Sequence, residues 1–176
     1  MSNLIFIGVL HKNFTPQEEL IDIVNNFHPF TLLVEIIQQD IESGNTSDYP
    51  PEMQAALKWG KAQHLRTYGF DVDINPLKKG VFKGDLNKVD REQQAIIKKH
   101  DWKDFNNPEL AKTLSTSSWH KVIDRGQWDK REHAMYNNIQ SRVNIEGNTV
   151  VITGCGHIPF LKEKYLSAQF PLQHSP

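Results

Sequence analysis

Two short motifs of the same form are the best candidates for chemistry in this sequence: Gly8-Val9-Leu10-His11 near its start and Gly154-Cys155-Gly156-His157 near its end. Histidine changes its protonation near neutral pH and ligates metals through its neutral imidazole, so it serves both as a general base and as a metal ligand. Glycine lets the backbone turn sharply and lets a ligand approach main-chain amides. The candidate positions are His11 and His157 for catalysis, and Gly8, Gly154 and Gly156 for contact with a substrate.

A third candidate is Glu35, which stands in an apolar run between Leu32-Leu33-Val34 and Ile36-Ile37. A carboxylate in such a run costs free energy unless it is paired with a positive charge or coordinates a metal ion. We therefore expect Glu35 to belong to a functional site, with a structural salt bridge as the alternative.

Arg131 is the expected partner of Glu35. It shares a helix face with Met135, Asn138 and Ile139, so its side chain should point inward. Asp129 and Glu132 resemble a capping box that opens this helix, which would place Arg131 in the first turn, where a positive charge opposes the helix dipole. This placement suggests that Arg131 orients Glu35 or holds a substrate anion. Asn138 is a candidate substrate contact, although it could equally cap or hydrogen-bond a loop.

The elements that must position these residues alternate between strands and helices, which predicts an α/β fold. The pattern indicates a single domain over residues 1–176, with a mainly parallel open sheet, flanking helices and a helical insertion that caps the sheet at about residues 77–127. The expected strands are 4–7, 31–35, 70–74 and 148–153, and the main helices begin near 15, 52, 90, 129 and 158. The helix that begins at residue 52 is expected to run to Tyr68 and to end at Gly69.

Ligands of open α/β sheets bind beyond the carboxyl ends of the strands. The polar residues at or just after these ends are His11, Glu35, Asn75 and His157. The carboxyl ends of parallel strands meet at one edge of a sheet, so we expect His11, Glu35 and His157 to converge there.

Composition excludes several classes of function. The net charge of −1 and the isoelectric point near 6.7 do not suggest a nucleic-acid binder, which normally has a basic face. The single cysteine excludes an intramolecular disulfide and fits a reducing compartment. The apolar run at residues 4–10 has no basic segment before it and is far shorter than the roughly 20 residues that span a bilayer. We expect a cytoplasmic protein without a membrane segment.

Two other motifs resemble functional sites, but their details do not support a nucleophilic cysteine or a dinucleotide-binding loop. Cys155 precedes His157 by two residues, but a nucleophile and its base would have to face each other across a glycine, so a small buried residue is the better interpretation. Gly154 and Gly156 begin like a dinucleotide-binding loop, yet Pro159 occupies the third glycine position and no acidic ribose ligand follows.

These motifs and their order resemble the TraB/PrgY–GumN–Tiki superfamily, to which the erythromycin-esterase-like and haem-binding ChaN-like folds are more distantly related. The resemblance rests on the ordered set Gly8 to His11, Leu33-Val34-Glu35, Arg131 to Met135 and Val150 to His157, and does not cover residues 77–127. It implies a parallel α/β core whose two histidines and glutamate line one pocket. Tiki members are described as metal-dependent proteases that use these residues, the esterase relatives as hydrolases, and other members as regulators or haem binders.

The first hypothesis is therefore a hydrolase that cleaves an ester or amide bond of a small-molecule or peptide substrate. In this reading His11, Glu35 and His157 bind a divalent metal such as Mn, Co or Zn, or act on water directly, and Arg131 stabilises developing negative charge. The alternatives are a non-catalytic module that binds a metal, haem or a small ligand, and a protein that only interacts with other proteins. The sequence does not indicate an oligomeric state.

Overall fold

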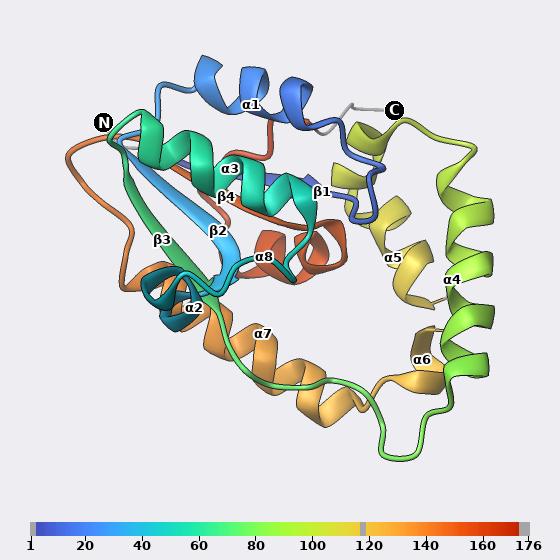
Figure 1. The fold of residues 1–176 in the computed structure, drawn as a ribbon. Helices are drawn as coiled ribbons and strands as arrows, with labels where there is room; N and C mark the ends of the chain where they lie inside the picture. The colour runs from blue at the N-terminus through green and yellow to red at the C-terminus, as the bar shows by residue number, and fades with distance from the viewer. Residues whose placement is uncertain (1–2, 117–118, 173–176) are drawn as a thin grey trace.

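Four parallel strands form the centre of the computed structural model, which describes residues 3–116 and 119–172 (Figure 1). The order across the sheet is β1-β4-β2-β3, and all pairings between these strands of the described chain are parallel. The predicted α/β fold with a mainly parallel sheet is confirmed. The strands are β1 (Leu4–Val9), β2 (Thr31–Ile37), β3 (Arg66–Asp71) and β4 (Thr149–Gly154).

Helices cover both faces of the sheet. One face packs against α1 (Gln17–Asn26) and α3 (Pro51–Ala62), and the other packs against α7 (Arg125–Gln140) and α8 (Ile158–Lys164) (Figure 1). Each face has its own apolar cluster, because neighbouring side chains of a strand point to opposite sides. Among the helices of residues 3–116 and 119–172, none is both long and apolar enough to cross a bilayer.

The alternation along β2 decides on which face Glu35 lies. Leu32 and Val34 belong to the cluster beneath α1 and α3, whereas Leu33 belongs to the cluster beneath α7 and α8. Glu35 follows Leu33 by two residues, so it faces α7 and α8. The carboxylate therefore lies on the side where α7 supplies Arg131 and where the turn after β4 supplies His157.

The segment 77–127 is mostly helical. It contains α4 (Lys83–Ile97), the 3₁₀ helix η1 (Trp102–Asn106), α5 (Pro108–Thr116) and α6 (Trp119–Val122). It does more than cap the sheet, because Phe105 is fully buried in the cluster beneath α1 and α3. The side chain of Asn106 accepts a hydrogen bond from the amide of Gly8 at 2.6 Å and donates one to the Gly8 carbonyl at 3.0 Å. Part of the segment thus covers the free edge of β1.

The helix predicted over residues 52–68 is too long. α3 ends at Ala62, and Tyr68 and Gly69 belong to β3, where they pair with Leu33 and Val34 of β2. Gly69 is needed for close packing and does not end a helix, since a Cβ at this position would lie 2.3 Å from the carbonyl oxygen of Ile36. The prediction failed because local helix propensity is outweighed by strand pairing that only the tertiary structure provides.

The helix starts predicted near residues 90 and 129 are also wrong, since α4 begins at Lys83 and α7 at Arg125. Asp124 caps α7 by accepting a hydrogen bond from the amide of Gln127, so Arg131 lies in the second turn and Glu132 is not part of a capping box. α1 begins at Gln17, close to the predicted start near residue 15. Its N-cap is Pro16, and the hydroxyl of Thr15 does not cap the helix but accepts a hydrogen bond from the amide of Leu10. A short helix that the sequence did not predict, α2 (Gln38–Ser43), follows β2.

The two hydrogen bonds between Asn106 and Gly8 predict that this contact stabilises the fold. Asn106→Ala should lower the free energy of unfolding by about 1–3 kcal/mol, because it leaves a buried amide of β1 without a partner. Urea denaturation measures the change. Asn137→Ala, at an exposed position of α7, is the control and should change stability by less than about 0.5 kcal/mol. Equal losses in the two variants would contradict the prediction.

Candidate functional site

Glu35 is the centre of a buried polar cluster at the carboxyl ends of the strands. Its Oε2 accepts hydrogen bonds from the amide of Gly154 at 2.6 Å and from the hydroxyl of Thr153 at 2.8 Å. Its Oε1 accepts one from Nη2 of Arg131 at 3.0 Å and lies 3.5 Å from Nε2 of His157. The apolar run of β2 therefore carries a carboxylate whose oxygens both have partners, as its burial requires.

Arg131 reaches Glu35 from α7 and is held by a second carboxylate. Its Nε and Nη2 donate to Asp71, the last residue of β3, at 2.9 and 2.7 Å. This geometry is a bidentate guanidinium–carboxylate pair, which fixes orientation as well as charge. Of the two roles expected for Arg131, the contacts favour orienting Glu35, since the Nε and Nη2 donors are committed to protein carboxylates.

His157 is buried and enclosed on three sides. Its Nδ1 lies 3.1 Å from Oε1 of Glu132, its Nε2 faces Glu35, and its ring stacks on Trp128 with centroids 4.8 Å apart and an angle of 12° between the planes. Trp128, Arg131, Glu132 and Met135 follow one another at helical spacing, so α7 presents all of them to the sheet.

His11 differs from His157 in being accessible. Its side chain is 40% exposed, whereas that of His157 is 5% exposed. Nδ1 of His11 lies 2.5 Å from Oε1 of Glu52, a fully buried residue in the first turn of α3. Nε2 of His11 lies on the side of Gly154 and Glu35: a Cβ built on Gly154 would be 3.0 Å from it and 3.5 Å from Oε2 of Glu35.

Both histidines thus have the same arrangement of partners. A buried glutamate holds Nδ1, and Nε2 is turned toward Glu35. A carboxylate on one ring nitrogen fixes the tautomer and the orientation of the ring. Oε2 of Glu52 is buried and has no hydrogen-bond partner within the described part of the chain. The charge of Glu52 is therefore compensated chiefly through His11.

Close packing accounts for glycine at two of the three motif positions, Gly8 and Gly154. None of Gly8, Gly154 and Gly156 has a positive φ. A Cβ on Gly8 would lie 2.8 Å from Ile158, and one on Gly154 would lie close to the ring of His11. Nothing within 4 Å would meet a Cβ on Gly156. No positive φ therefore requires glycine at these positions, and of the three only Gly154 lies beside His11 and Glu35.

Three further polar or sulfur-containing residues near the strand ends have contacts within the protein. Asn138 donates to the carbonyl of Phe70 at 3.0 Å and ties α7 to β3. Asn75 lies beyond β3, which ends at Asp71, and its side chain accepts from the amide of Leu77. Cys155 is buried, and burial raises the pKa of its thiol to about 12, which agrees with the interpretation of Cys155 as a small buried residue.

Charge compensation shifts the pKa values at the centre of the site. Burial acts to raise the pKa of Glu35, but His157, Arg131 and His11 outweigh it and hold this pKa well below its usual range. Burial likewise acts to lower the pKa of His157, but Glu35 and Glu132 outweigh it and raise this pKa to about 9. At neutral pH His157 is therefore an imidazolium between two carboxylates.

The side chains in this arrangement do not form a ready metal site. Within residues 3–116 and 119–172 no group of three or more His, Cys, Asp or Glu side chains is arranged to hold a metal ion. Glu35 already accepts three hydrogen bonds, and a divalent ion would have to replace the proton of His157 and change the partners of Glu35. We therefore derive no chemical step through a metal.

Sequence reasoning did not identify four residues of the site: Glu52, Asp71, Trp128 and Glu132. A signal for two of them was present, because Trp128 and Glu132 share the helical spacing of Arg131 and Met135. Asp71 was assigned to the middle of a strand, since the predicted strand began four residues too late. For Glu52 no local signal exists, because it lies in a helix whose position over His11 is set by tertiary packing.

No family model, no curated protein and no solved structure matches this chain. The description of the site therefore rests on its geometry.

The surroundings of His157 predict a high titration midpoint. In protein treated with EDTA, the ring signals of His157 in an NMR titration should move with a midpoint near pH 9. Since this pKa lies above the unfolded value of about 6.5, the bound proton stabilises the fold fully below pH 6.5. That contribution is lost as the pH rises from about 6.5 to about 9. Glu132→Gln should lower the midpoint, and a wild-type midpoint below 7 would contradict the assignment of charge.

The hydrogen bonds of Glu35 predict a large effect of its neutralisation. Glu35→Gln should lower the free energy of unfolding by about 3–5 kcal/mol, because it removes the negative charge that compensates Arg131 and His157 in a buried site. Thermal or urea denaturation measures the loss. Glu163→Gln, at an exposed position of α8, is the control and should be nearly neutral. A loss below about 1 kcal/mol in Glu35→Gln would show that the ion pairs contribute little.

Proposed function

We propose that this protein is a hydrolase that cleaves an ester or amide bond at the edge of the sheet, with His11 as the general base. The observation that carries the proposal is the accessible ring of His11 backed by the fully buried carboxylate of Glu52 at 2.5 Å. A carboxylate acceptor keeps the proton on Nδ1 and leaves Nε2 free to accept one, as a general base must.

The proposed step uses a water molecule beside Nε2 of His11. His11 takes a proton from this water while the oxygen adds to the carbonyl carbon of the substrate. The C–O or C–N bond then breaks, and His11 returns the proton to the leaving oxygen or nitrogen. Negative charge on Glu52 stabilises the imidazolium that forms between the two proton transfers.

His157 has a different role in this proposal. Its ring is enclosed by Trp128, Glu35 and Glu132, so it holds the cluster together and does not exchange protons with substrate. The amide of Gly154 donates to Glu35, and Gly154 also borders the ring of His11. Glu35 therefore fixes the position of Gly154, and Gly154 in turn lies beside the ring of His11.

Metal binding is the second candidate, and one observation favours it. A buried carboxylate on Nδ1 is the arrangement that orients many metal-ligating histidines, and both His11 and His157 have one. Binding of Mn, Co or Zn by these rings and Glu35 would require Glu35 to change its hydrogen-bond partners. Elemental analysis and calorimetric titration with each ion, together with absorbance during haem addition, distinguish these ligands from hydrolysis without a cofactor.

The buried single cysteine is compatible with the cytoplasmic location that composition predicts.

The catalytic proposal predicts unequal effects of substitution. On a panel of chromogenic esters and quenched fluorescent peptides, His11→Ala should lower kcat by about 10²–10⁴-fold, the usual contribution of a general base. Glu52→Gln should lower kcat less, with KM nearly unchanged. His133→Ala is the control, since His133 is exposed on α7, where its Nδ1 lies 2.8 Å from the Asp129 carbonyl oxygen and its ring packs edge-on against Phe160.

Hydrolysis in a folded His11→Ala variant at the wild-type rate would refute the assignment of the base. If EDTA abolishes wild-type activity and Mn, Co or Zn restores it, the metal-dependent mechanism replaces the one described here. Circular dichroism spectra of all variants separate loss of chemistry from loss of fold.

A further inference from the structure

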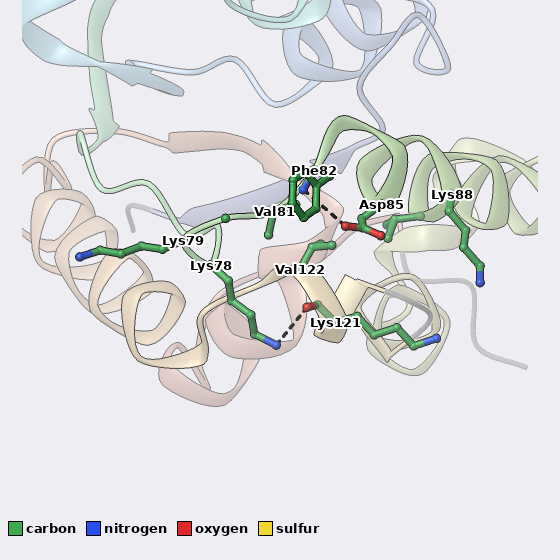
Figure 2. A pocket seen from close by; sticks show the side chains of 10 residues that line it. Lys78, Lys79, Val81, Phe82, Asp85, Lys88, Lys121 and Val122 are labelled. Atoms are coloured by element: carbon green, nitrogen blue, oxygen red, sulfur yellow. Dashed lines mark hydrogen bonds between the residues drawn. The ribbon is translucent and has the colours of Figure 1, made fainter.

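A lysine-rich hollow of about 380 Å³ lies in the segment 77–127, away from the polar cluster around Glu35 (Figure 2). We call it the lysine pocket. Its walls are the loop before α4, the beginning of α4 and the end of α6. Four lysines line it, together with a single acidic residue, Asp85, whose carboxylate accepts a hydrogen bond from the amide of Phe82. The four lysines are Lys78, Lys79, Lys88 and Lys121.

The positive charge of the lysine pocket is not balanced locally. Lys78 donates to the backbone carbonyls of His120 and Lys121 at 3.1 and 3.0 Å, and carbonyl groups do not cancel its charge. No carboxylate of residues 3–116 and 119–172 lies within ion-pair distance of Lys79, Lys88 or Lys121. Clustered like charges repel one another, so an anionic partner would be stabilised here.

The floor of the lysine pocket is apolar. It includes Val81 and the buried side chains of Val89 and Val122. Phe82 lies next to Val81 and Asp85 and has 76% of its surface exposed (Figure 2). The hollow therefore offers positive charge around its rim and apolar surface at its centre. A complementary ligand carries several negative charges on both sides of an apolar side chain.

The wall of the lysine pocket is preformed. Lys78 donates its amide to the carbonyl of Val122 at 2.8 Å, and Leu77 pairs with Ile123 in an antiparallel bridge. The amide of Asp124 donates to the carbonyl of Pro76 at 2.8 Å and closes the same pairing. The loop before α4 is therefore already ordered when a ligand binds, which lowers the entropic cost of binding.

The pocket is connected to the candidate active site through its floor. Val89 and Val122 belong to an apolar cluster that also contains Trp128. The ring of Trp128 stacks on His157 at 4.8 Å. Trp128 thus contacts both the apolar floor of the lysine pocket and His157 of the Glu35 cluster.

We propose that the lysine pocket docks an acidic peptide segment with an apolar side chain between its carboxylates. The lysines favour this ligand over a single phosphate group because they diverge: Lys79 extends to one side, and Lys88 and Lys121 extend to the other (Figure 2). The chain's net charge of −1 favours it over a nucleic acid, which needs a broad basic face. Docking of a substrate for cleavage at His11 rests on the proposed function, whereas peptide binding itself does not.

Fluorescence anisotropy of a labelled peptide in which two Glu pairs flank a central Phe tests the proposal. The wild-type protein should bind this peptide more weakly as salt rises, and should bind the same peptide with Gln in place of Glu at least about tenfold less tightly. The triple variant Lys79→Glu, Lys88→Glu, Lys121→Glu should lose about tenfold or more in affinity. Phe82→Ala should weaken binding without altering its salt dependence.

The matched control is the triple variant Lys58→Glu, Lys61→Glu, Lys99→Glu, which makes the same change of net charge at exposed positions outside the pocket. It should bind the acidic peptide as the wild type does. Equal losses in both triple variants, equal binding of the Gln peptide, or stronger binding of a single-stranded oligonucleotide than of the acidic peptide would each overturn the proposal. His11→Ala should retain peptide binding, so failure of the catalytic proposal and failure of docking give different results.

Discussion

The buried negative charge of Glu35 is the constraint on which the rest of the site depends. A carboxylate removed from water must be compensated by hydrogen bonds and positive charge, or it takes up a proton. Here Gly154 and Thr153 of β4 supply two hydrogen bonds, and Arg131 of α7 supplies a third with its charge. The strand order places β4 beside β2. The partners of Glu35 therefore come both from the neighbouring strand and from α7, so its charge is compensated only when the strand register and the position of α7 are both correct.

Compensation then extends outward in a chain of alternating charges. Asp71 holds Arg131, and Glu132 holds His157, so each positive group near Glu35 has a second carboxylate behind it. Counting Glu52, four carboxylates surround one guanidinium and two imidazoles. This excess of negative charge favours the protonated form of His157. It also means that any cation at the site competes with a proton already bound there.

The two histidines have similar partners but different access to solvent, and this difference separates their roles. His157 lies beneath Trp128 and contributes to the buried network, whereas His11 follows β1 in an irregular segment and stays partly open. Side chains of the segment 77–127, and Trp128 directly after it, contact the elements that carry the two histidines. Asn106 fixes the backbone of β1 at Gly8, Asp90 of α4 forms an ion pair with Lys12 next to His11, and Trp128 joins His157 to the apolar floor of the lysine pocket.

The sequence by itself determined the α/β class, the parallel sheet and the meeting of His11, Glu35 and His157 at one edge. These follow from patterns within single strands and from the rule that the carboxyl ends of parallel strands share an edge, so no knowledge of helix packing was required. The pairing of Glu35 with Arg131 was also predictable, because an isolated carboxylate in an apolar strand needs a positive partner and α7 carries an arginine on its inward face.

Only the tertiary structure decided which carboxylates stand behind the two histidines. Glu52 is 41 residues from His11, and Glu132 is 25 residues from His157. The first pair joins α3 to the segment after β1, and the second joins α7 to the turn after β4. The spacing of α7 places Glu132 on its inward face, but it does not show that Glu132 meets His157, and nothing local singles out Glu52 in α3. Both contacts depend on how α3 and α7 pack on opposite faces of the sheet. The same reason explains the error at β3: its pairing with β2 outweighs a local pattern that reads as helix.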